Sequence, residues 1–594
     1  MELNVSLDKV YTSFEAEEFQ NDLKKLDQMI NKMNRWLQDN LNSTEEPVRK
    51  IEEYLTLKSN LISLHEDMTH YTYFVMQSDL REREAQKYWG RLQAKNSDLE
   101  EPEVRFQKWL DSLENLDEII SSSPLLEEHR FYLCDLVDKV QYRLSEKEEK
   151  LLARLSNTGS QAWNQLQGQL TSGLKVEWVS DGEERTITMG ELSNILFDNP
   201  QLISKTYEAE YKAYDQISVP VAAALNGVKG EVLTELDLRG YESPLEKALV
   251  DFRMEEATLT VLLDTIKKSL GFFRKFYKRK AEILGFENGL PIDLRFKPVA
   301  ESSLEYTPKE ARDLIVRSFK QFSDPLADFA ERSFSEEWFD AEMREGKMRG
   351  GFCMNFHSLK ESRILHNFHG GLQDVAGLAH ELGHAYHFSC LANHEPVLNR
   401  EYTPPISETA STFAQTMIDK TALEEVSKKE KLAALDSSLA MYSAIILNSY
   451  RDYLFEAEVF ERRKDHSLPV EELRELELSL QKDIFKDSVD SRYLSGHDWI
   501  NRILHYYAEV NFYNFPYAFG LLLAKGIYAQ WKIEGKSFVD KFEKMLAVTG
   551  KASVEKALAM LGIDLSDKEF WQRSLAMLKE DVEEFIRLSE ELNY

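Results

Sequence analysis

Apolar residues recur at spacings of three and four along most of the chain, which is the pattern of amphipathic helices. The pattern is clear in residues 15–117, for example in FQNDLKKLDQMINKMNRWLQDNL, and long helical stretches return after residue 200. Heptad repeats do not persist, which favours packed antiparallel helices over a coiled coil. The sequence therefore predicts a mainly α protein.

Two regions depart from this helical pattern. Residues 175–189 alternate apolar and polar side chains, like a small hairpin around a turn at Ser180, Asp181 and Gly182. Between residues 285 and 368 the short runs LPIDLRFKPV, GGFCMNF and SRILHNF look extended, and the turn-like HSLKE separates the last two. A small strand region is therefore expected directly before residue 374.

The length of 594 residues is too great for one simple core, so two or three structural units are expected. We predict an N-terminal helical region at 1–120, a second unit at 121–198 and the largest unit at 199–594.

Charge and composition limit the kinds of molecule that the protein is expected to bind and the compartment in which it is expected to lie. The 103 acidic and 73 basic residues give a formal charge of -30, which disfavours nucleic acid and anionic membranes. The acidic start lacks the basic and apolar segments of an export signal. The apolar run YAFGLLLAKGIYAQW, interrupted by Lys525, is too short to cross a bilayer, and three scattered cysteines disfavour a disulfide framework. These features predict a cytoplasmic protein.

The stretch DVAGLAHELGHAYHFSC contains an H-E-x-x-H motif at His380, Glu381 and His384. We expect Asp374 to cap this helix at its N-terminus. Residues four apart on a helix differ by about 40° around its axis, so both histidines can hold one zinc ion. Glu381 is offset from His384 by about 60° and can reach a water on the metal without being a ligand. A helix face with two solvated histidines is the alternative interpretation.

A catalytic zinc ion needs a third protein ligand and an open position. In PPISETASTFAQTMI, Pro404 and Pro405 are expected to end a loop and Glu408 to begin a returning helix. Glu408 is therefore the predicted third ligand. Ser411, close to one turn later, is a candidate hydrogen-bond partner that supports a ligand from behind.

His387 and Cys390 also lie on the histidine helix. The extension H-E-x-x-H-x-x-G-x-x-H is absent, because position 387 is His and position 390 is Cys. As ligands these two side chains would overfill the site, so we interpret both as packing or supporting residues.

GLAHELGHAYH followed by PISETASTF resembles the oligoendopeptidase F branch of the thimet oligopeptidase-like family of zinc metallopeptidases. The upstream MRGGFCMNFHSLKESRILHNFHGGLQDV and the downstream WINRILHYYAEVNFYNFPYAFG resemble the same branch. The likeness covers most of the chain from about residue 125, whereas the first hundred residues match only in helical character.

The resemblance implies roles for individual residues. His380, His384 and Glu408 would hold one Zn²⁺ per chain, and Glu381 would be the general base for attack by a zinc-bound water. His505, Tyr513 and Tyr517 fall where the family has groups that close over substrate and stabilise the oxyanion.

The chain departs from the branch at two positions near these aromatic residues. Leu504 stands where the branch commonly has proline, and Phe515 where it often has tyrosine. The alternative interpretation of Tyr513 and Tyr517 is that they lie four apart on a buried helix face.

The resemblance also implies an elongated helical body with thermolysin-like active-site helices and a small β region beside a deep substrate channel. Residues 121–198 would form the oligoendopeptidase F-type N-terminal domain and residues 199–594 the zinc metallopeptidase catalytic domain. A strand bordering the cleft can bind an extended substrate along its edge. We therefore expect a metalloendopeptidase, a hydrolase of the EC 3.4.24 type, that acts on internal bonds of short unstructured oligopeptides. A zinc carboxypeptidase of related helical fold and a non-catalytic helical scaffold are the alternatives.

Overall fold

The computed structural model describes residues 3, 5–180 and 183–594, and the chain divides into two compact units. The first unit contains Met1–Gln141, Leu304–Glu425 and Ile527–Asp564, and the second contains Tyr142–Ser303, Val426–Gly526 and Leu565–Tyr594. Helices dominate both units, which confirms the predicted mainly α class. The boundaries predicted at residues 120 and 198 stay a prediction.

The first unit holds a bundle of N-terminal helices and the helices that surround a small sheet. The rings of Tyr54 and Phe106 stack within the buried core of the bundle, where Phe19 and Leu26 are also fully buried. The helices are α1 (Glu17–Asn40), α2 (Pro47–Ser78), α3 (Arg83–Gln93), α4 (Asn96–Asp111), α5 (Leu116–Ser121), α6 (Pro124–Glu128), α7 (Arg130–Asp138), α14 (Pro308–Phe322), α15 (Asp324–Ser335), α16 (Leu372–His394), α17 (Pro404–Glu425), α21 (Val539–Val548) and α22 (Val554–Ala559).

The small sheet of the first unit has the strand order β3-β5-β4. Strand β3 (Phe339–Asp340) runs parallel to β5 (Glu361–Leu365), and β4 (Phe352–Phe356) runs antiparallel to it. The predicted extended runs GGFCMNF and SRILHNF are therefore confirmed. Helix α16 packs against β4 and β5, and β4 lies at an edge of the sheet.

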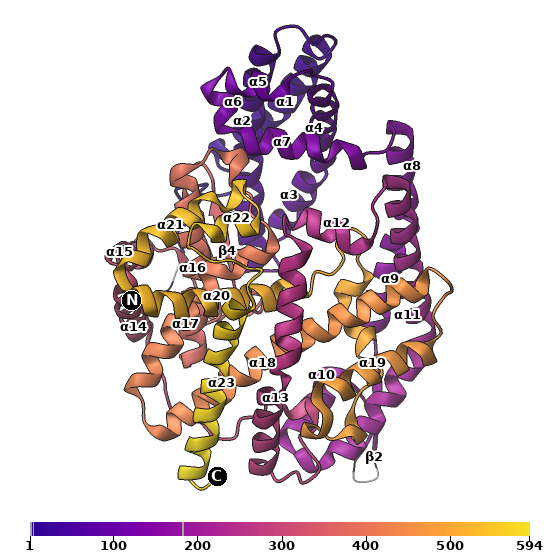
Figure 1. Ribbon diagram of the computed structural model, residues 1–594, viewed down its shortest axis with the longest axis vertical. Helices are drawn as coiled ribbons and strands as arrows, with labels where there is room; N and C mark the ends of the chain where they lie inside the picture. Colours follow the sequence, from indigo (N-terminus) through magenta and orange to yellow (C-terminus); the bar gives the residue numbers. More distant parts are fainter. Residues whose placement is uncertain (1–2, 4, 181–182) are drawn as a thin grey trace. The chain divides into compact units, whose positions relative to one another are not determined.

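In the second unit the long helices α13, α18 and α23 pack against one another (Figure 1). Its helices are α8 (Glu146–Ser156), α9 (Ser160–Ser172), α10 (Met189–Asp198), α11 (Ile203–Arg239), α12 (Pro244–Asp251), α13 (Glu256–Ile283), α18 (Lys428–Arg463), α19 (Val470–Phe485) and α23 (Lys568–Glu591). Helix α20 (Phe515–Glu534) begins in this unit and ends in the first.

The predicted hairpin of the second unit is confirmed, since β1 (Lys175–Ser180) pairs antiparallel with β2 (Glu183–Thr188). The predicted turn residues Asp181 and Gly182 lie outside the described residues. The prediction that LPIDLRFKPV is extended was wrong. This segment contains a short 3₁₀ helix, Ile292–Leu294, because Pro291 and Pro298 cannot donate to a strand ladder.

Helix α18 is long and apolar enough to cross a membrane, but 67% of its most apolar window is buried inside the protein. The apolar run predicted near the C-terminus lies in α20, where Leu522 and Leu523 are fully buried. Lys525 in that run is also buried, with its ammonium 4.1 Å from the centre of the Tyr442 ring. The apolar residues of both helices thus form protein core.

Candidate metal centre and active site

Helix α16 carries the H-E-x-x-H motif and begins at Leu372. The prediction of Asp374 as its N-cap was wrong, because the N-cap is Gly371 and Asp374 lies in the first turn. The Asp374 carboxylate accepts hydrogen bonds from the backbone N–H groups of His369, at 2.9 Å, and Gly371, at 3.0 Å. It therefore satisfies the free N–H groups ahead of the helix from a position inside it.

His380, His384 and Glu408 converge on one point. One ligand atom from each residue lies within 4.8 Å of the other two. Oε2 of Glu408 is 3.2 Å from Nε2 of His380 and 3.6 Å from Nε2 of His384. Two imidazole nitrogens and one carboxylate oxygen form a donor set typical of catalytic zinc, so these residues fit the predicted metal ion.

Glu408 reaches the histidines because α16 and α17 lie side by side (Figure 1). Pro404 is the first residue of α17, so the prediction that Pro404 and Pro405 end a loop was wrong. Proline is favoured in a first turn, where its missing N–H would have no helical partner. Gly383 permits the close approach of the helices, since a Cβ there would lie 2.5 Å from the Ala410 carbonyl oxygen.

Hydrogen bonds orient two of these side chains from behind. The Ser411 hydroxyl donates to Oε2 of Glu408 at 2.8 Å, which is the contact predicted from the sequence. Nδ1 of His380 lies 3.2 Å from Oε1 of Gln415. Because an amide oxygen only accepts, Nδ1 carries a proton, so Nε2 is the ring nitrogen that would bind a metal. Gln415 was not predicted from the sequence, although it lies two turns after Glu408 on the same face of α17.

The protonation states of Glu408 and His384 suit a cation. Burial lowers the pKa of His380, but the hydrogen bond with Glu408 and the nearby carboxylates outweigh burial and raise it, so a metal ion would have to displace a proton from this ring. Burial opposes ionisation of Glu408, but the hydrogen bond from His380 and the charges of both histidines outweigh it, and its pKa falls to about 2. Burial, followed by repulsion from His380, lowers the pKa of His384 to about 4. An ionised carboxylate and a neutral imidazole are the forms that bind metal ions.

Glu381 is buried beside the metal-donor cluster, with 8% of its surface exposed. Burial raises the pKa of its carboxyl, the charge of His380 lowers it and the charge of Glu408 raises it, and together they give a pKa of about 7. A Cβ at Gly351, next to strand β4, would lie 3.2 Å from Oε1 of Glu381. The carboxyl therefore faces the strands and has a pKa suited to accepting and returning a proton near neutrality.

His387 and Cys390 have the contacts of packing residues, as predicted. Nε2 of His387 lies 2.7 Å from the Thr549 hydroxyl, and its buried ring stacks on Tyr402 at 4.1 Å between centres. Cys390 is a buried free thiol. Within the described part of the chain, neither belongs to the metal-donor cluster.

His505 lies in the second unit, in the short 3₁₀ helix Ile503–Tyr506, and is almost completely buried. Its Nδ1 atom is 3.7 Å from Oε2 of Glu456 on α18, which is also buried. The structure therefore surrounds this predicted site residue with protein and places it beside a buried carboxylate.

Glu456 holds the segment between His505 and α20. Its carboxylate accepts a hydrogen bond from Nζ of Lys229 on α11 at 2.5 Å and another from the Phe512 N–H at 3.0 Å. Lys229 also donates to Oδ1 of Asn511 at 3.1 Å. This buried ion pair fixes the backbone just before Tyr513. This ion pair was not predicted from the sequence, because no short motif links three segments so far apart.

Tyr513 and Tyr517 lie at the start of α20, with their ring centres 6.0 Å apart. Tyr513 precedes the helix and is half-buried, whereas Tyr517 lies in its first turn and is 45% exposed. The alternative interpretation, that both tyrosines lie on a buried helix face, was therefore wrong.

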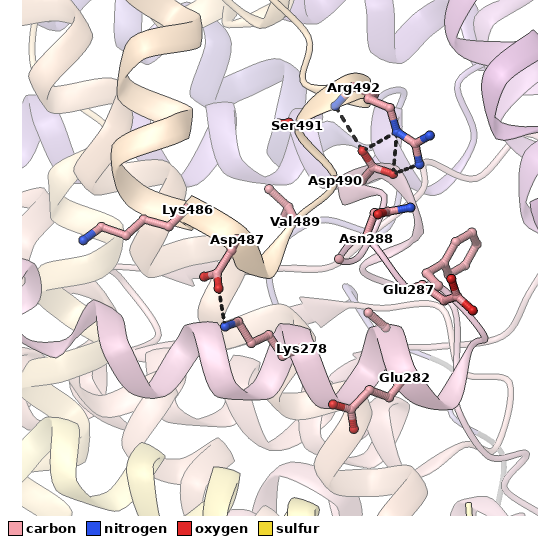
Figure 2. A pocket seen from close by; sticks show the side chains of 13 residues that line it. Lys278, Glu282, Glu287, Asn288, Lys486, Asp487, Val489, Asp490, Ser491 and Arg492 are labelled. Atoms are coloured by element: carbon pink, nitrogen blue, oxygen red, sulfur yellow. Dashed lines mark hydrogen bonds and ion pairs between the residues drawn. The ribbon is translucent and has the colours of Figure 1, made fainter.

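A hollow of about 660 Å³ lies in the second unit between α13 and the segment after α19 (Figure 2). Lys278 pairs with Asp487 at 2.6 Å, and Arg492 pairs with Asp490 at 2.6 Å. These charges neutralise one another, and the metal-donor cluster found among the described residues lies elsewhere. We assign this hollow no catalytic role.

Comparisons with known proteins agree with the geometry of the site. The model of peptidase family M3 matches residues 315–577, and the Oligopeptidase F model matches residues 112–175. Oligopeptidase PepF of Bacillus subtilis (strain 168) is 24% identical over 480 residues, which cover 80% of this chain and 71% of that protein. The oligoendopeptidase F homolog of Lactococcus lactis subsp. lactis (strain IL1403) is 24% identical over 566 residues, 91% of this chain and 90% of that protein.

Solved structures share the fold. The oligoendopeptidase-F of Enterococcus faecium has a TM-score of 0.71 at 17% identity, covering 96% of this chain and 100% of that one. A structure from Chlamydophila abortus has a TM-score of 0.83 at 21% identity, with coverage of 99% and 98%. The family resemblance predicted from the sequence motifs is confirmed by these matches. The chain belongs to peptidase family M3 and is a metalloendopeptidase of the oligoendopeptidase F type.

Proposed function

We propose that the protein is a zinc-dependent endopeptidase that hydrolyses internal bonds of short, unstructured oligopeptides. The observation that carries this proposal is the convergence of His380, His384 and Glu408 next to the buried Glu381. Membership of a family of oligopeptidases supports the substrate class. The deep substrate channel and the cytoplasmic location stay predictions.

One zinc ion per chain would be held by His380, His384 and Glu408. When bound, zinc polarises the scissile carbonyl and makes a nearby water more acidic. Ser411 and Gln415 keep Glu408 and His380 in the orientation and the tautomer that binding requires.

Glu381 is the proposed general base. Its carboxylate takes a proton from the attacking water and delivers that proton to the leaving amine as the peptide bond breaks. A pKa of about 7 suits both transfers, because the group is then neither a strong acid nor a strong base. Proton transfer of this kind contributes about 100- to 10,000-fold to turnover.

The edge of strand β4 is the proposed binding site for the substrate backbone. The Asn355 carbonyl accepts a hydrogen bond from His70 at 2.7 Å, so the Asn355 backbone points away from β5. Cys353, two residues earlier, presents its backbone to the same side. Since His70 occupies the Asn355 carbonyl, an extended peptide would pair with the strand at Cys353, and such pairing does not require a free chain end.

Oxyanion stabilisation is assigned to a phenol of Tyr513 or Tyr517. Both rings lie at the start of α20, and the exposure of Tyr517 leaves its ring accessible. We assign the buried His505 to the support of this segment rather than to contact with substrate, because it lies beside Glu456.

Cleavage of peptides blocked at both ends is the direct test. The protein is incubated with mixed blocked peptides and a folded protein, and the cuts are mapped by mass. We expect internal cuts in the peptides alone, loss of activity with a chelator and recovery with zinc. A requirement for a free carboxyl terminus would instead favour the carboxypeptidase alternative, while the family assignment removes the scaffold alternative.

Glu381→Gln tests the mechanism. This variant should keep one zinc per chain and lose at least about 100-fold in kcat, because the water loses its base. Glu287→Gln, at an exposed position in the second unit, is the control and should cleave normally. Full activity of Glu381→Gln would overturn the assignment.

A further inference from the structure

His366 lies at the end of strand β5, where the backbone holds it on both sides. Its N–H donates to the Asp340 carbonyl at 2.8 Å, and its own carbonyl accepts from Nζ of Lys347 at 2.6 Å. The backbone of His366 is therefore fixed. His366 lies within SRILHNF, and no role was predicted for it from the sequence.

The imidazole of His366 lies between two glycines. A Cβ at Gly377 of α16 would lie 2.5 Å from Cε1 and 2.9 Å from Nε2 of the ring. A Cβ at Gly351 would lie 2.7 Å from Nδ1. Since real Cβ atoms do not approach so closely, the ring occupies this place only because both positions lack a side chain.

The same space brings His366 next to Glu381. A Cβ built at Gly351 would lie 2.7 Å from Nδ1 of His366 and 3.2 Å from Oε1 of Glu381. The two polar atoms are therefore at most about two hydrogen-bond lengths apart, a gap that one water can bridge. Gly377 lies one turn before Glu381 on α16, which explains how one ring contacts the glycine and approaches the carboxyl.

Both ring nitrogens of His366 are shielded from solvent, and neither has a hydrogen-bond partner in the described part of the chain. An unpaired buried polar atom destabilises the folded state, so such a group calls for a functional reason. Burial also lowers the pKa of this imidazole to about 4. The neutral ring keeps one N–H donor and one acceptor near pH 7.

We propose that His366 is a positioning residue for Glu381: the His366 imidazole orients the carboxyl of the general base by a hydrogen bond through one water. The inference rests on the proposed function of Glu381. One carboxyl oxygen would be held on the strand side, which leaves the other to the attacking water. His366 then acts through Glu381 and binds neither metal nor substrate.

Kinetics of His366→Ala and His366→Gln test the role in the whole zinc-loaded protein. We expect His366→Ala to lower kcat about 10- to 100-fold with KM and zinc content unchanged, as for other residues that orient catalytic groups. His366→Gln, whose amide can still donate, should recover part of the loss. Wild-type kcat in His366→Ala would overturn the proposal, as would loss of zinc or a rise in KM alone.

Gly377→Ala offers a test that leaves the imidazole in the chain. Alanine favours a helix over glycine, so a fall in kcat must come from displacement of the ring. We expect a fall comparable to that of His366→Ala and no further fall in the double variant. Gly271→Ala is the matched control, because a Cβ at this helical glycine of α13 meets nothing within 4 Å. Additive losses would contradict the proposal.

A measurement on metal-free protein separates this inference from the proposed function. The denaturant midpoints of His366→Ala, Glu381→Gln and the double variant are compared. If the two residues are coupled, the midpoint of the double variant should shift by an amount that differs from the sum of the shifts in the two single variants. Additive shifts overturn the positioning role even if the wild type is an active zinc peptidase. If the wild type cleaved no peptide but the midpoint shifts were not additive, the His366 contact would be supported and the proposed function would fail.

Discussion

Two buried glutamates, one in each unit, have opposite electrostatic surroundings. Burial raises the pKa of Glu381 on α16 to about 7. Burial also opposes ionisation of Glu456 on α18, but the charge of Lys229 and the contact with His505 outweigh it, and the pKa of Glu456 falls to about 2. Both side chains are at least nine-tenths buried, so the partner and not the burial makes the difference.

The comparison separates a carboxyl suited to chemistry from one suited to structure. A group with a pKa near neutrality can accept and return a proton, whereas a carboxylate that stays charged cannot. Glu456 instead accepts hydrogen bonds from Lys229 and from the Phe512 N–H, and so holds the segment before Tyr513. The metal-donor cluster is built on two adjacent helices, while the tyrosines depend on a buried ion pair.

The largest effect is expected on the α16 side of this comparison. His384→Ala should lose bound zinc and nearly all peptide cleavage, because two donors do not hold catalytic zinc. His387→Ala is the matched control on the same helix, since its ring contacts Thr549 and Tyr402. It should keep one zinc per chain and only unfold at lower temperature. Zinc analysis of both purified variants checks this, and loss of zinc from His387→Ala would contradict the ligand assignment.

Glu456→Gln should destabilise the second unit, where the buried carboxylate is paired. Removing one partner of a buried ion pair leaves Lys229 uncompensated and costs about 3–5 kcal/mol. The free energy of unfolding is measured with denaturant. Zinc content should stay at one per chain, because the pair lies in a different unit from the metal-donor cluster. A stability equal to that of the wild type would show that the pair is not structural.

Variants of Tyr513 and Tyr517 test the oxyanion role of the segment that the buried Lys229–Glu456 pair holds. Tyr513→Phe or Tyr517→Phe should lower kcat about 100- to 1000-fold, since one oxyanion donor is lost. KM and zinc content should change little. Tyr211→Phe, at an exposed position on α11, is the control. If both variants at α20 cleave at the wild-type rate, neither phenol is the donor.

The smallest effect is expected in the pH dependence of the free energy of unfolding, which tests the raised pKa of Glu381. The pKa of Glu381 in the folded protein, about 7, lies above its unfolded value, so the folded state binds the extra proton and loses stability as pH rises through this window. In metal-free protein at pH 8, Glu381→Gln should therefore be more stable than the wild type by about 3 kcal/mol. The gain should shrink towards pH 4. Denaturant unfolding at several pH values measures it, and a gain independent of pH would contradict the burial argument.

The metal-donor residues could be predicted largely from the sequence, whereas their supporting residues could not. His380 and His384 follow from spacing on one helix, and Glu408 from the motif on the next. Asp374 was misassigned, because several positions in a first turn can satisfy the same N–H groups. Gln415 left a weak signal in its spacing from Glu408, but nothing local marks the contact between Lys229 and Glu456.

The sequence by itself determined the helical class, the short strands before α16 and the residues that converge as metal donors, because these depend on periodicity, on spacing within α16 and on a motif in α17. Only the tertiary structure decided how closely α17 approaches α16 at Gly383, which carboxyl is paired and which is not, and where the imidazole of His366 lies. Burial and partner distance set these properties, and both arise from packing between segments that are far apart in the chain.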